Sequence, residues 1–431
     1  MTLQALEQLK PFEARAIIED LRKGSVPIEY VPFFTVGRQN WLKFIGEDLD
    51  NYIAEGGAKV RFINGDYGDG KTHFMSVIRH LALEKKFAVS FVVLTREVPI
   101  HKFEIVYQTI VRQLCGSFDG TGIRQLVDDW VENLKADQTD DAPLEEQLFS
   151  VGESLRALSG MDLNFANALI GLADNRLRPL EAGEDEEARA YQREILYQWF
   201  EGARVSKRDL KPFQIFEALD KTNSKRLLTS LIVFLRHLNY KGLVLLMDEL
   251  ETVIAQSTTI RNASYENVRL LIDNAEQASY LHIFMSIIPD VTLSEKGFKS
   301  YDALWSRVRS IGESKRLNYR SVLIDLHRTP LEIGELVNLG LCLKRIHELS
   351  YRWDAQKQIG EDLLKKMCAA QNRMGLLSEV RLYIKQVIRI LDMAEQGVPP
   401  DEDMDMAEQL VVSQREMEQE KVEQLQPKWD A

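Results

Sequence analysis

The feature that most constrains the fold of this chain is a glycine-rich loop between an apolar segment and a helical pattern. Residues 58–64 read AKVRFIN, which predicts a β-strand, and residues 73–81 show the apolar spacing of a helix. Residues 65–72 between them read GDYGDGKT and match the pattern G-x-x-x-x-G-K-T. This context predicts a phosphate-binding loop (P-loop); the alternative is a chance glycine loop before a surface helix.

Each residue type in the loop suits the binding of a nucleoside triphosphate. The glycines lack Cβ, so the backbone can turn tightly and approach phosphate oxygens. The loop amides and the N-terminus of the next helix then face the phosphates. The Lys71 ammonium is expected near the β- and γ-phosphates, and the Thr72 hydroxyl is expected to bind Mg²⁺. The predicted ATP-binding residues are Gly65, Asp66, Tyr67, Gly68, Asp69, Gly70, Lys71, Thr72 and His73.

Two adjacent carboxylates follow a second apolar run. Residues 243–247 read LVLLM, which predicts a central strand of a parallel sheet. Two acids at the end of such a strand are costly to bury without a partner, and a metal–nucleotide complex supplies one. We therefore expect Asp248 to hold Mg²⁺ and Glu249 to activate the attacking water as a general base. The alternative is an acidic pair that caps the next helix.

Composition limits the classes of partner. The net charge of −12 excludes a protein that coats nucleic acid through bulk electrostatics, so any contact with DNA requires a local basic patch or takes place as part of an assembly. The three cysteines are far apart, which predicts reduced thiols and no zinc site. There is no signal-peptide pattern, and no apolar stretch approaches the ~18–20 residues of a membrane span. We therefore expect a cytoplasmic protein without a membrane segment.

The order of patterns predicts an α/β fold with a parallel P-loop core, a helical insert and a C-terminal helical lid. Further strands are expected at 87–94, 281–288 and 322–326. The predicted boundaries are 1–30 for an N-terminal helical segment, 31–115 and 223–330 for the ATPase core, 116–222 for the insert, 331–398 for the lid and 399–431 for an acidic tail.

Three arginines are candidates for contact with the nucleotide. Arg38, directly after Gly37, is expected either near the adenine or in a solvated turn. Arg307 is a candidate finger toward the γ-phosphate of a neighbouring subunit, the alternative being an ordinary arginine on a polar helix face. Arg381, early in a lid helix, is a candidate sensor of the γ-phosphate in its own chain. The finger hypothesis implies self-association as a ring or a dimer.

With these residues, the chain resembles AAA+ type ATPases, and more narrowly the ATP-binding proteins of bacterial BREX phage-defence systems, the BrxC/BrxD-like family. The similarity covers roughly residues 10–395. It is carried by the opening helix and turn at 17–27, by 36–38, by the P-loop with 72–74, by 199–202 and by 240–251. The resemblance implies an AAA+ P-loop fold, ATP and Mg²⁺ as cofactors, and protein partners in a defence assembly.

One position departs from the family pattern. The family tends to end the strand before Pro289 in a threonine, a candidate polar sensor of the γ-phosphate, whereas this chain has Ile288. Isoleucine cannot form a hydrogen bond, and Ser286 can replace the threonine only if the strand register differs. This departure predicts hydrolysis that is slow or depends on a partner.

Three functions remain open at this point. The leading hypothesis is a Mg²⁺-dependent ATPase that converts ATP to ADP and phosphate in order to assemble or remodel a defence complex, on DNA or away from it. The alternative is a nucleotide-gated switch or scaffold with little hydrolysis. A DNA-dependent motor or loader is least favoured, because the segment after residue 395 is too short and too acidic for a winged-helix domain.

Overall fold

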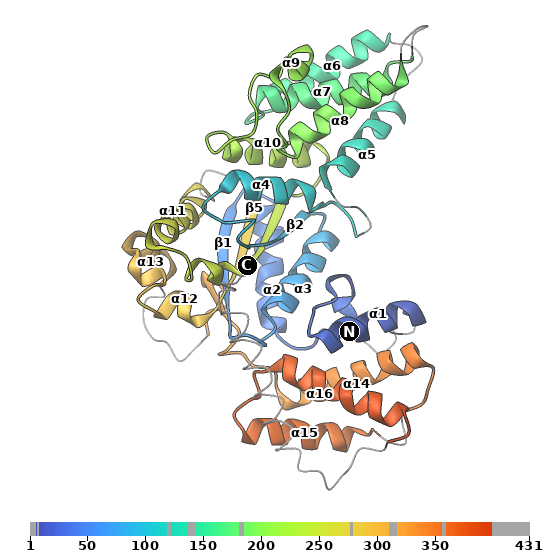
Figure 1. The fold of residues 1–431 in the computed structure, drawn as a ribbon, viewed down its shortest axis with the longest axis vertical. Helices are drawn as coiled ribbons and strands as arrows, with labels where there is room; N and C mark the ends of the chain where they lie inside the picture. The colour runs from blue at the N-terminus through green and yellow to red at the C-terminus, as the bar shows by residue number, and fades with distance from the viewer. Residues whose placement is uncertain are drawn as a thin grey trace, which may run out of the picture. The chain divides into compact units, whose positions relative to one another are not determined.

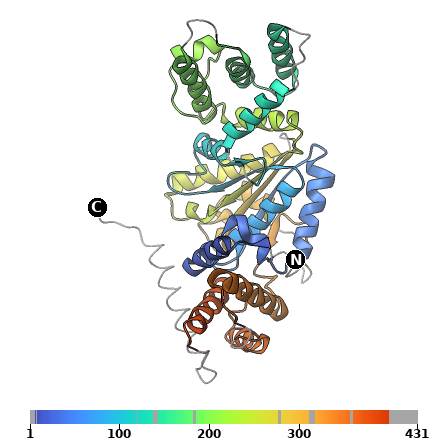
Figure 2. The same ribbon diagram turned by 90° about the vertical axis from the view of Figure 1, so that its right-hand side faces the viewer.

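Six strands form one sheet in the order β3-β2-β4-β5-β1-β6 in this computed structural model (Figures 1 and 2). The strands are β1 (Ala58–Asn64), β2 (Ala88–Val93), β3 (Leu114–Cys115), β4 (Leu243–Asp248), β5 (Leu281–Ile287) and β6 (Leu323–Asp325). The structure describes residues 6, 8–118, 120, 122–136, 143–180, 185–275, 279–309, 317–355 and 359–398.

The centre of the sheet is parallel and buried. β2 pairs in parallel with β4, and β4 pairs in parallel with β5, whereas the two-residue strand β3 pairs antiparallel with β2 at the edge. Every residue of β4 and β5 is buried. Unbroken apolar runs are expected for parallel strands that are covered on both faces, which is why these segments could be assigned from sequence.

The chain divides into two compact units. The first, here called the P-loop unit, consists of Met1–Leu42, Asn64–Val77 and Asp325–Ala431. The second, here called the sheet unit, consists of Lys43–Ile63 and Ile78–Ile324. The chain passes between the units at the ends of β1 and β6 and inside the helices α2 (Gln39–Asp48) and α3 (Lys71–Glu84).

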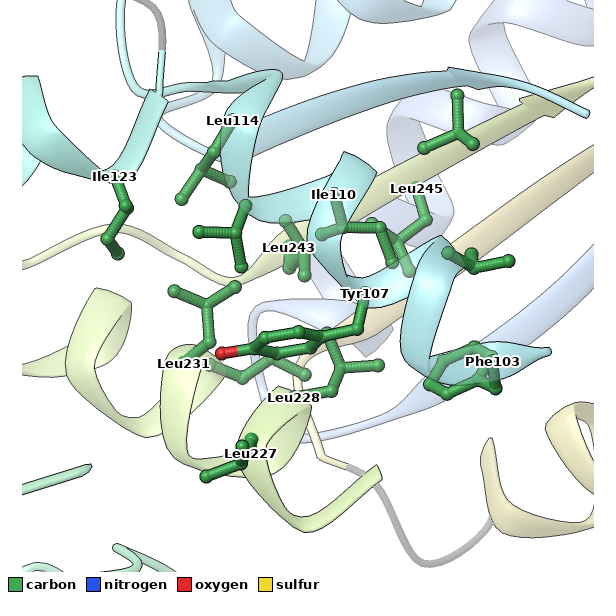
Figure 3. Close-up of a cluster of buried hydrophobic side chains, with 14 of the residues drawn as sticks. Phe103, Tyr107, Ile110, Leu114, Ile123, Leu227, Leu228, Leu231, Leu243 and Leu245 are labelled. Atoms are coloured by element: carbon green, nitrogen blue, oxygen red, sulfur yellow. The ribbon is translucent and has the colours of Figure 1, made fainter. Parts of the chain in front are cut away.

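Helices cover the sheet within the sheet unit. They are α4 (Phe103–Arg112), α10 (Ser224–His237), α11 (Thr258–Ala275), α12 (Pro289–Leu293) and α13 (Asp302–Val308). Figure 3 shows apolar side chains of α4 and α10 gathered over β4. Those labelled on the three elements are Phe103, Tyr107 and Ile110, then Leu227, Leu228 and Leu231, then Leu243 and Leu245. Burial of this cluster supplies the main stabilisation of the helix–sheet layer.

The helices that lie between α4 and α10 in the sequence form a group within the sheet unit. This group lies beyond α4 and α10, on the side of these two helices that faces away from the sheet (Figures 1 and 2). It contains α5 (Gly122–Ala136), α6 (Leu144–Ala157), α7 (Leu163–Leu177), α8 (Glu186–Phe200) and α9 (Lys207–Leu210). Edge-to-face aromatic pairs connect it to α10: Trp130 and Phe234 have ring centroids 5.4 Å apart. Within the group, the ring centroids of Phe165 on α7 and Phe200 on α8 lie 4.9 Å apart. These residues belong to the same apolar core that covers the sheet.

The P-loop unit has its own apolar core. Its helices are α1 (Pro11–Lys23), α14 (Ile333–Tyr351), α15 (Glu361–Arg373) and α16 (Val380–Glu395), and a 3₁₀ segment, η2 (Ile28–Phe33), follows α1. α14 packs against α1, α15 and α16 (Figure 1). Helices from the two ends of the sequence therefore share one core.

The expectation of a mixed α/β fold with a mostly parallel sheet is confirmed. The finer assignment to an AAA+ core with a lid stays a prediction. The predicted acidic tail at 399–431 lies outside the described residues.

Candidate nucleotide site

The loop after β1 has the backbone geometry that its glycines allow. Gly68 has φ +95° and Gly70 has φ +84°, values that residues with a Cβ rarely adopt. A Cβ on Gly65 would lie 3.1 Å from the Asp69 carboxylate, which is tighter than ordinary contact. The loop then leads directly into α3 at Lys71. The strand, loop and helix predicted from sequence are therefore present in that order.

The loop curls around the side chain of Lys71. The Lys71 ammonium donates to the carbonyl oxygens of Gly65 at 2.9 Å and Asp66 at 3.2 Å, and it lies 5.1 Å from the centroid of the Tyr67 ring. Lys71 is 8% exposed. A buried ammonium at a helix N-terminus is suited to receive an anion, because its charge and the positive end of the helix dipole attract negative charge.

Asp69 and Arg38 fix the shape of the loop. The Asp69 carboxylate accepts a hydrogen bond from the Asp66 amide at 2.7 Å, and the Arg38 Nη2 donates to the Asp69 carbonyl at 2.6 Å. Arg38 itself adopts a left-handed φ of 57°. Burial lowers the pKa of Arg38 to about 10, and the charges of Asp69 and Glu335 oppose this shift only partly. The guanidinium lies against the P-loop backbone, and a contact with adenine stays a prediction.

The first turn of α3 is held by the segment after η2. His73 Nε2 lies 3.1 Å from the Thr35 Oγ1, which donates in turn to the Val31 carbonyl. The Phe34 ring lies 5.2 Å from the His73 ring. Burial, assisted by the nearby Arg38 charge, lowers the pKa of His73 to about 3, so this imidazole is neutral near pH 7. Thr72, the predicted Mg²⁺ ligand, accepts a hydrogen bond at its carbonyl from Ser76 at 2.8 Å.

Two residues from the C-terminal half of the chain reach the loop. The Arg381 amide, at the start of α16, donates to the Gly68 carbonyl at 3.3 Å. His327 Nδ1 lies 3.6 Å from the Asp66 carboxylate and 3.9 Å from that of Asp69. The side chains of Asp66, Asp69 and His327 could hold a cation between them. Arg381 was predicted from sequence as a site residue, whereas nothing in the sequence pattern indicated His327.

The predicted metal and base residues lie at the end of β4, in the sheet unit. Asp248 is 3% exposed, and its carboxylate accepts hydrogen bonds from the Ser286 hydroxyl and from the Glu249 amide, the latter at 3.1 Å. The Glu249 amide also donates to the Ser286 Oγ at 2.9 Å. Glu249 has a left-handed φ of 66° and is half-buried. Such strain in a non-glycine residue costs on the order of 1–3 kcal/mol and is frequent at functional sites.

The strand register explains why Ser286 contacts Asp248. Met247 pairs with Met285, so the next residue of each strand lies level with its neighbour. The sequence argument placed Ile288 at the sensor position and accepted Ser286 only with a shifted register. In the structure, Ile288 precedes α12 in extended conformation, while Ser286 is the hydroxyl beside the acid. Pairing of β4 with β5 is the information that the sequence pattern lacked.

Arg307 on α13 is engaged within its own chain. Its guanidinium pairs with the Asp273 carboxylate of α11, with Nη2 3.0 Å from Oδ2, and it also donates to the Ala303 carbonyl. Its side chain is 35% exposed. A role of Arg307 in a neighbouring subunit therefore stays a prediction. Such a role requires the Arg307 guanidinium to leave Asp273.

A family model described as "BREX system ATP-binding protein BrxC/D" matches residues 9–411. The chain belongs to this BREX family. The resemblance based on the opening helix, the P-loop and the D-E-L-E segment is thereby confirmed, and family membership supports a BREX-associated role in binding ATP. Searches of curated proteins and of solved structures give no significant match. Among the described helices, none combines the length and the apolar character needed to cross a bilayer.

Proposed function

We propose that this BREX family member is a Mg²⁺-dependent ATPase that converts ATP to ADP and phosphate. The observation that carries the proposal is the buried Lys71 ammonium inside a glycine loop at a helix N-terminus. A second support is the Asp248–Glu249 pair at the exit of a buried parallel strand, with Ser286 bonded to it. The P-loop lies in one unit and the acidic pair in the other. The proposal therefore rests on the chemistry of these residues and uses no distance between the loop and the acids.

In this proposal the loop amides, Lys71 and Thr72 bind the triphosphate, with the Thr72 hydroxyl and Asp248 holding Mg²⁺. Mg²⁺ neutralises charge on the β- and γ-phosphates when it is bound. Glu249 orients a water molecule and accepts its proton, while Ser286 fixes the Asp248 carboxylate. We assign residues 331–398 the role of a lid, because Arg381 in this segment bonds to the P-loop. The expected output is assembly or remodelling of a defence complex.

The first test compares ATP binding with steady-state turnover in three proteins. Lys71→Ala is expected to lose ATP binding, because it removes the charge at the centre of the loop. Glu249→Gln is expected to bind ATP with wild-type affinity and to lower kcat at least 100-fold, because general-base catalysis contributes on the order of 10²–10⁴. Wild-type turnover by Glu249→Gln would overturn the assignment of the base.

A nucleotide-gated switch is the second candidate. The observation that favours it is the intrachain pairing of Arg307 with Asp273. Tight ATP binding by the wild type, with no turnover in the presence or absence of DNA, would support the switch. In that case Lys71→Ala still loses binding, and Glu249→Gln has no kinetic effect to measure.

A further inference from the structure

A pocket of about 230 Å³ opens in the sheet unit beyond the ends of β2 and β4. Residues 95–102, which follow β2, form one side; the 3₁₀ segment η5 (Leu250–Val253) and the start of α11 form the other. Arg96, His101 and Lys102 are among its lining residues. Of the described residues, no aspartate or glutamate contributes to the lining. This is a local basic surface on a chain whose net charge is −12.

The two permanent charges of the pocket are available to a ligand. Arg96 and Lys102 are both exposed, and within the part of the chain that the structure describes neither forms an ion pair. Glu97, the acid beside Arg96, accepts a hydrogen bond from the Thr95 hydroxyl at 2.9 Å instead. An anion in this pocket therefore meets two cations without displacing an existing salt bridge.

The rest of the lining favours a phosphate presented by a larger molecule. Ile100 and Val253 are buried apolar residues, and low-dielectric walls strengthen the field of the charges above them. Thr252 and Ser264 also line the pocket. Their hydroxyls donate to the carbonyls of Glu249 and Ile260, both at 2.9 Å, so these hydroxyls hold the wall and leave the phosphate to the two cations. The volume lies below the ~300 Å³ at which pockets begin to enclose whole small molecules. The pocket therefore fits one group of a polymer better than a complete metabolite.

The pocket walls are fixed by hydrogen bonds. The Asn267 side chain on α11 donates to the Ile100 carbonyl at 3.1 Å, and the Lys102 amide donates to the Pro99 carbonyl at 2.9 Å. On the opposite wall, the Thr252 hydroxyl donates to the Glu249 carbonyl at 2.9 Å. A ligand that contacts Thr252 is therefore one hydrogen bond away from the backbone of the proposed general base.

We propose that this pocket binds a phosphodiester group of a nucleic-acid strand, with Arg96 and Lys102 as the phosphate-binding residues. Binding there stabilises η5 through Thr252 and thereby stimulates turnover; this second step rests on the proposed ATPase function. Phosphate contacts of this kind hold a strand without reading its sequence. The binding step is independent of hydrolysis and is tested without it.

The test titrates the full chain into fluorescein-labelled DNA, single-stranded and duplex, and follows anisotropy at several salt concentrations. The double variant Arg96→Glu/Lys102→Glu is expected to bind at least 10-fold more weakly, with a salt slope reduced by about 1, since both residues contact the same phosphate and each lost phosphate reduces the slope by about 1. The matched control is Arg208→Glu, whose side chain is 94% exposed outside the pocket and which is expected to bind as the wild type does. A methylphosphonate strand, which lacks the backbone charge, is expected not to bind.

Several outcomes would overturn the proposal: no DNA binding by the wild type, wild-type affinity in the double variant, or equal binding of the neutral strand. Competition by millimolar inorganic phosphate without any binding of DNA would instead identify a free-anion site and also reject the proposal. A fluorescent ATP analogue checks the P-loop separately. Pocket-dependent DNA binding without turnover rejects the ATPase function alone, and turnover without DNA binding rejects the pocket alone.

Thr252 tests the second step. Thr252→Val is expected to keep DNA affinity and to lose stimulation of kcat by DNA, whereas Thr252→Ser retains the hydroxyl and the stimulation. Equal stimulation in the wild type and in Thr252→Val would reject the coupling through η5.

Discussion

The hydroxyl of Ser286 donates a hydrogen bond to the carboxylate of Asp248, between the neighbouring strands β5 and β4. The same oxygen accepts the amide of Glu249. Ser286 and Asp248 are both buried, and a hydrogen bond to a charged group is stronger in such surroundings than in water. One small side chain thus fixes the direction of one acid and the backbone of the next.

Ser286→Ala is expected to lower kcat about 10- to 100-fold, because a hydrogen bond to a charged group is worth about 1.5–3 kcal/mol. The Mg²⁺ concentration for half-maximal turnover is expected to rise as well, since Asp248 loses an orienting contact. A Mg²⁺ titration of ATP turnover measures both effects. Ser286→Thr keeps a hydroxyl and serves as control. An unchanged Mg²⁺ requirement in Ser286→Ala would show that the hydroxyl does not position the metal ligand.

Gly37→Ala is expected to destabilise the P-loop unit by roughly 2–4 kcal/mol. Gly37 has φ +69°, which costs an L-residue about 1–2 kcal/mol. Its Cβ would lie 2.5 Å from a methyl group of Leu331 and 2.7 Å from the Glu335 carboxylate. Chemical unfolding measures the loss. Gly334→Ala is the matched control: nothing lies within 4 Å of its added Cβ, and alanine in a helix gains about 0.5–1 kcal/mol. Equal stability of the two variants would contradict the steric argument.

Asp392→Ala is expected to lower the free energy of unfolding by about 2–3 kcal/mol, because it removes a hydrogen-bond partner of half-buried Arg22 and of buried His347. The Asp392 carboxylate accepts from Arg22 at 2.8 Å and contacts His347 Nε2 at 2.9 Å, which joins α1, α14 and α16. The exposed pair Glu361–Lys365 provides the control, since Glu361→Ala is expected to change stability by less than about 0.5 kcal/mol. Similar unfolding curves for the two variants would refute the importance of this network.

The same carboxylate gives an acid dependence with a definite sign. Burial alone would raise the pKa of Asp392, but hydrogen bonds from His347 and Arg22 outweigh it and lower the pKa below the usual value. The contribution to stability is therefore present above about pH 4 and is lost as the pH falls through the lower folded pKa. Comparison of wild type and Asp392→Ala between neutral pH and pH 3 measures this loss.

His282 predicts a second pH effect, at a higher pH. It is fully buried in β5, and within the described residues neither ring nitrogen has a hydrogen-bond partner. Burial, with the charges of Arg61 and Lys59, holds its pKa well below the usual value. Below about pH 6.5 the unfolded chain binds a proton at His282 and the folded chain does not. The free energy of unfolding therefore decreases by about 1.4 kcal/mol for each unit by which the pH is lowered in this range.

His282→Leu is expected to reduce the loss of unfolding free energy between pH 7.5 and 5.5 by about 1.4 kcal/mol, while buried His73, whose pKa is lowered to about 3, keeps a loss of similar size in both proteins. Denaturant unfolding at the two pH values measures the difference. The leucine variant is also expected to be at least as stable as the wild type at neutral pH, because an unpaired buried polar group is replaced by an apolar one. An equal pH slope in both proteins would assign the acid sensitivity elsewhere.

Sequence reasoning succeeded where the information is local. β1 has its predicted bounds, β5 lies within its predicted segment, and β4 extends its predicted run by one residue, Asp248, because strands buried on both faces need unbroken apolar sequence. The loop that follows β1 has its structure dictated by its own glycines. β3 was missed because two residues at a sheet edge leave no periodic pattern.

The contacts around the candidate site depended on pairing between distant segments, which periodicity does not encode. Ser286 reaches Asp248 only through the register of β5 on β4. His327 approaches Asp66 from a segment far along the chain, and Arg307 is neutralised by Asp273 of another helix. A sequence shows that such side chains are present, whereas the packed fold decides which charges face one another.

The P-loop unit takes its residues from three stretches of chain, and this has a consequence during synthesis. Residues 64–77 leave the ribosome long before α14 and α16 exist. The hydrogen bond from the Arg381 amide to the Gly68 carbonyl forms only after Arg381 has been synthesised. The packing of Leu331 and Glu335 beside the turn at Gly37 likewise forms late. A nascent or truncated chain therefore carries the phosphate-binding motif without its supports. We therefore expect the predicted loop to bind a nucleotide only after synthesis has passed α16.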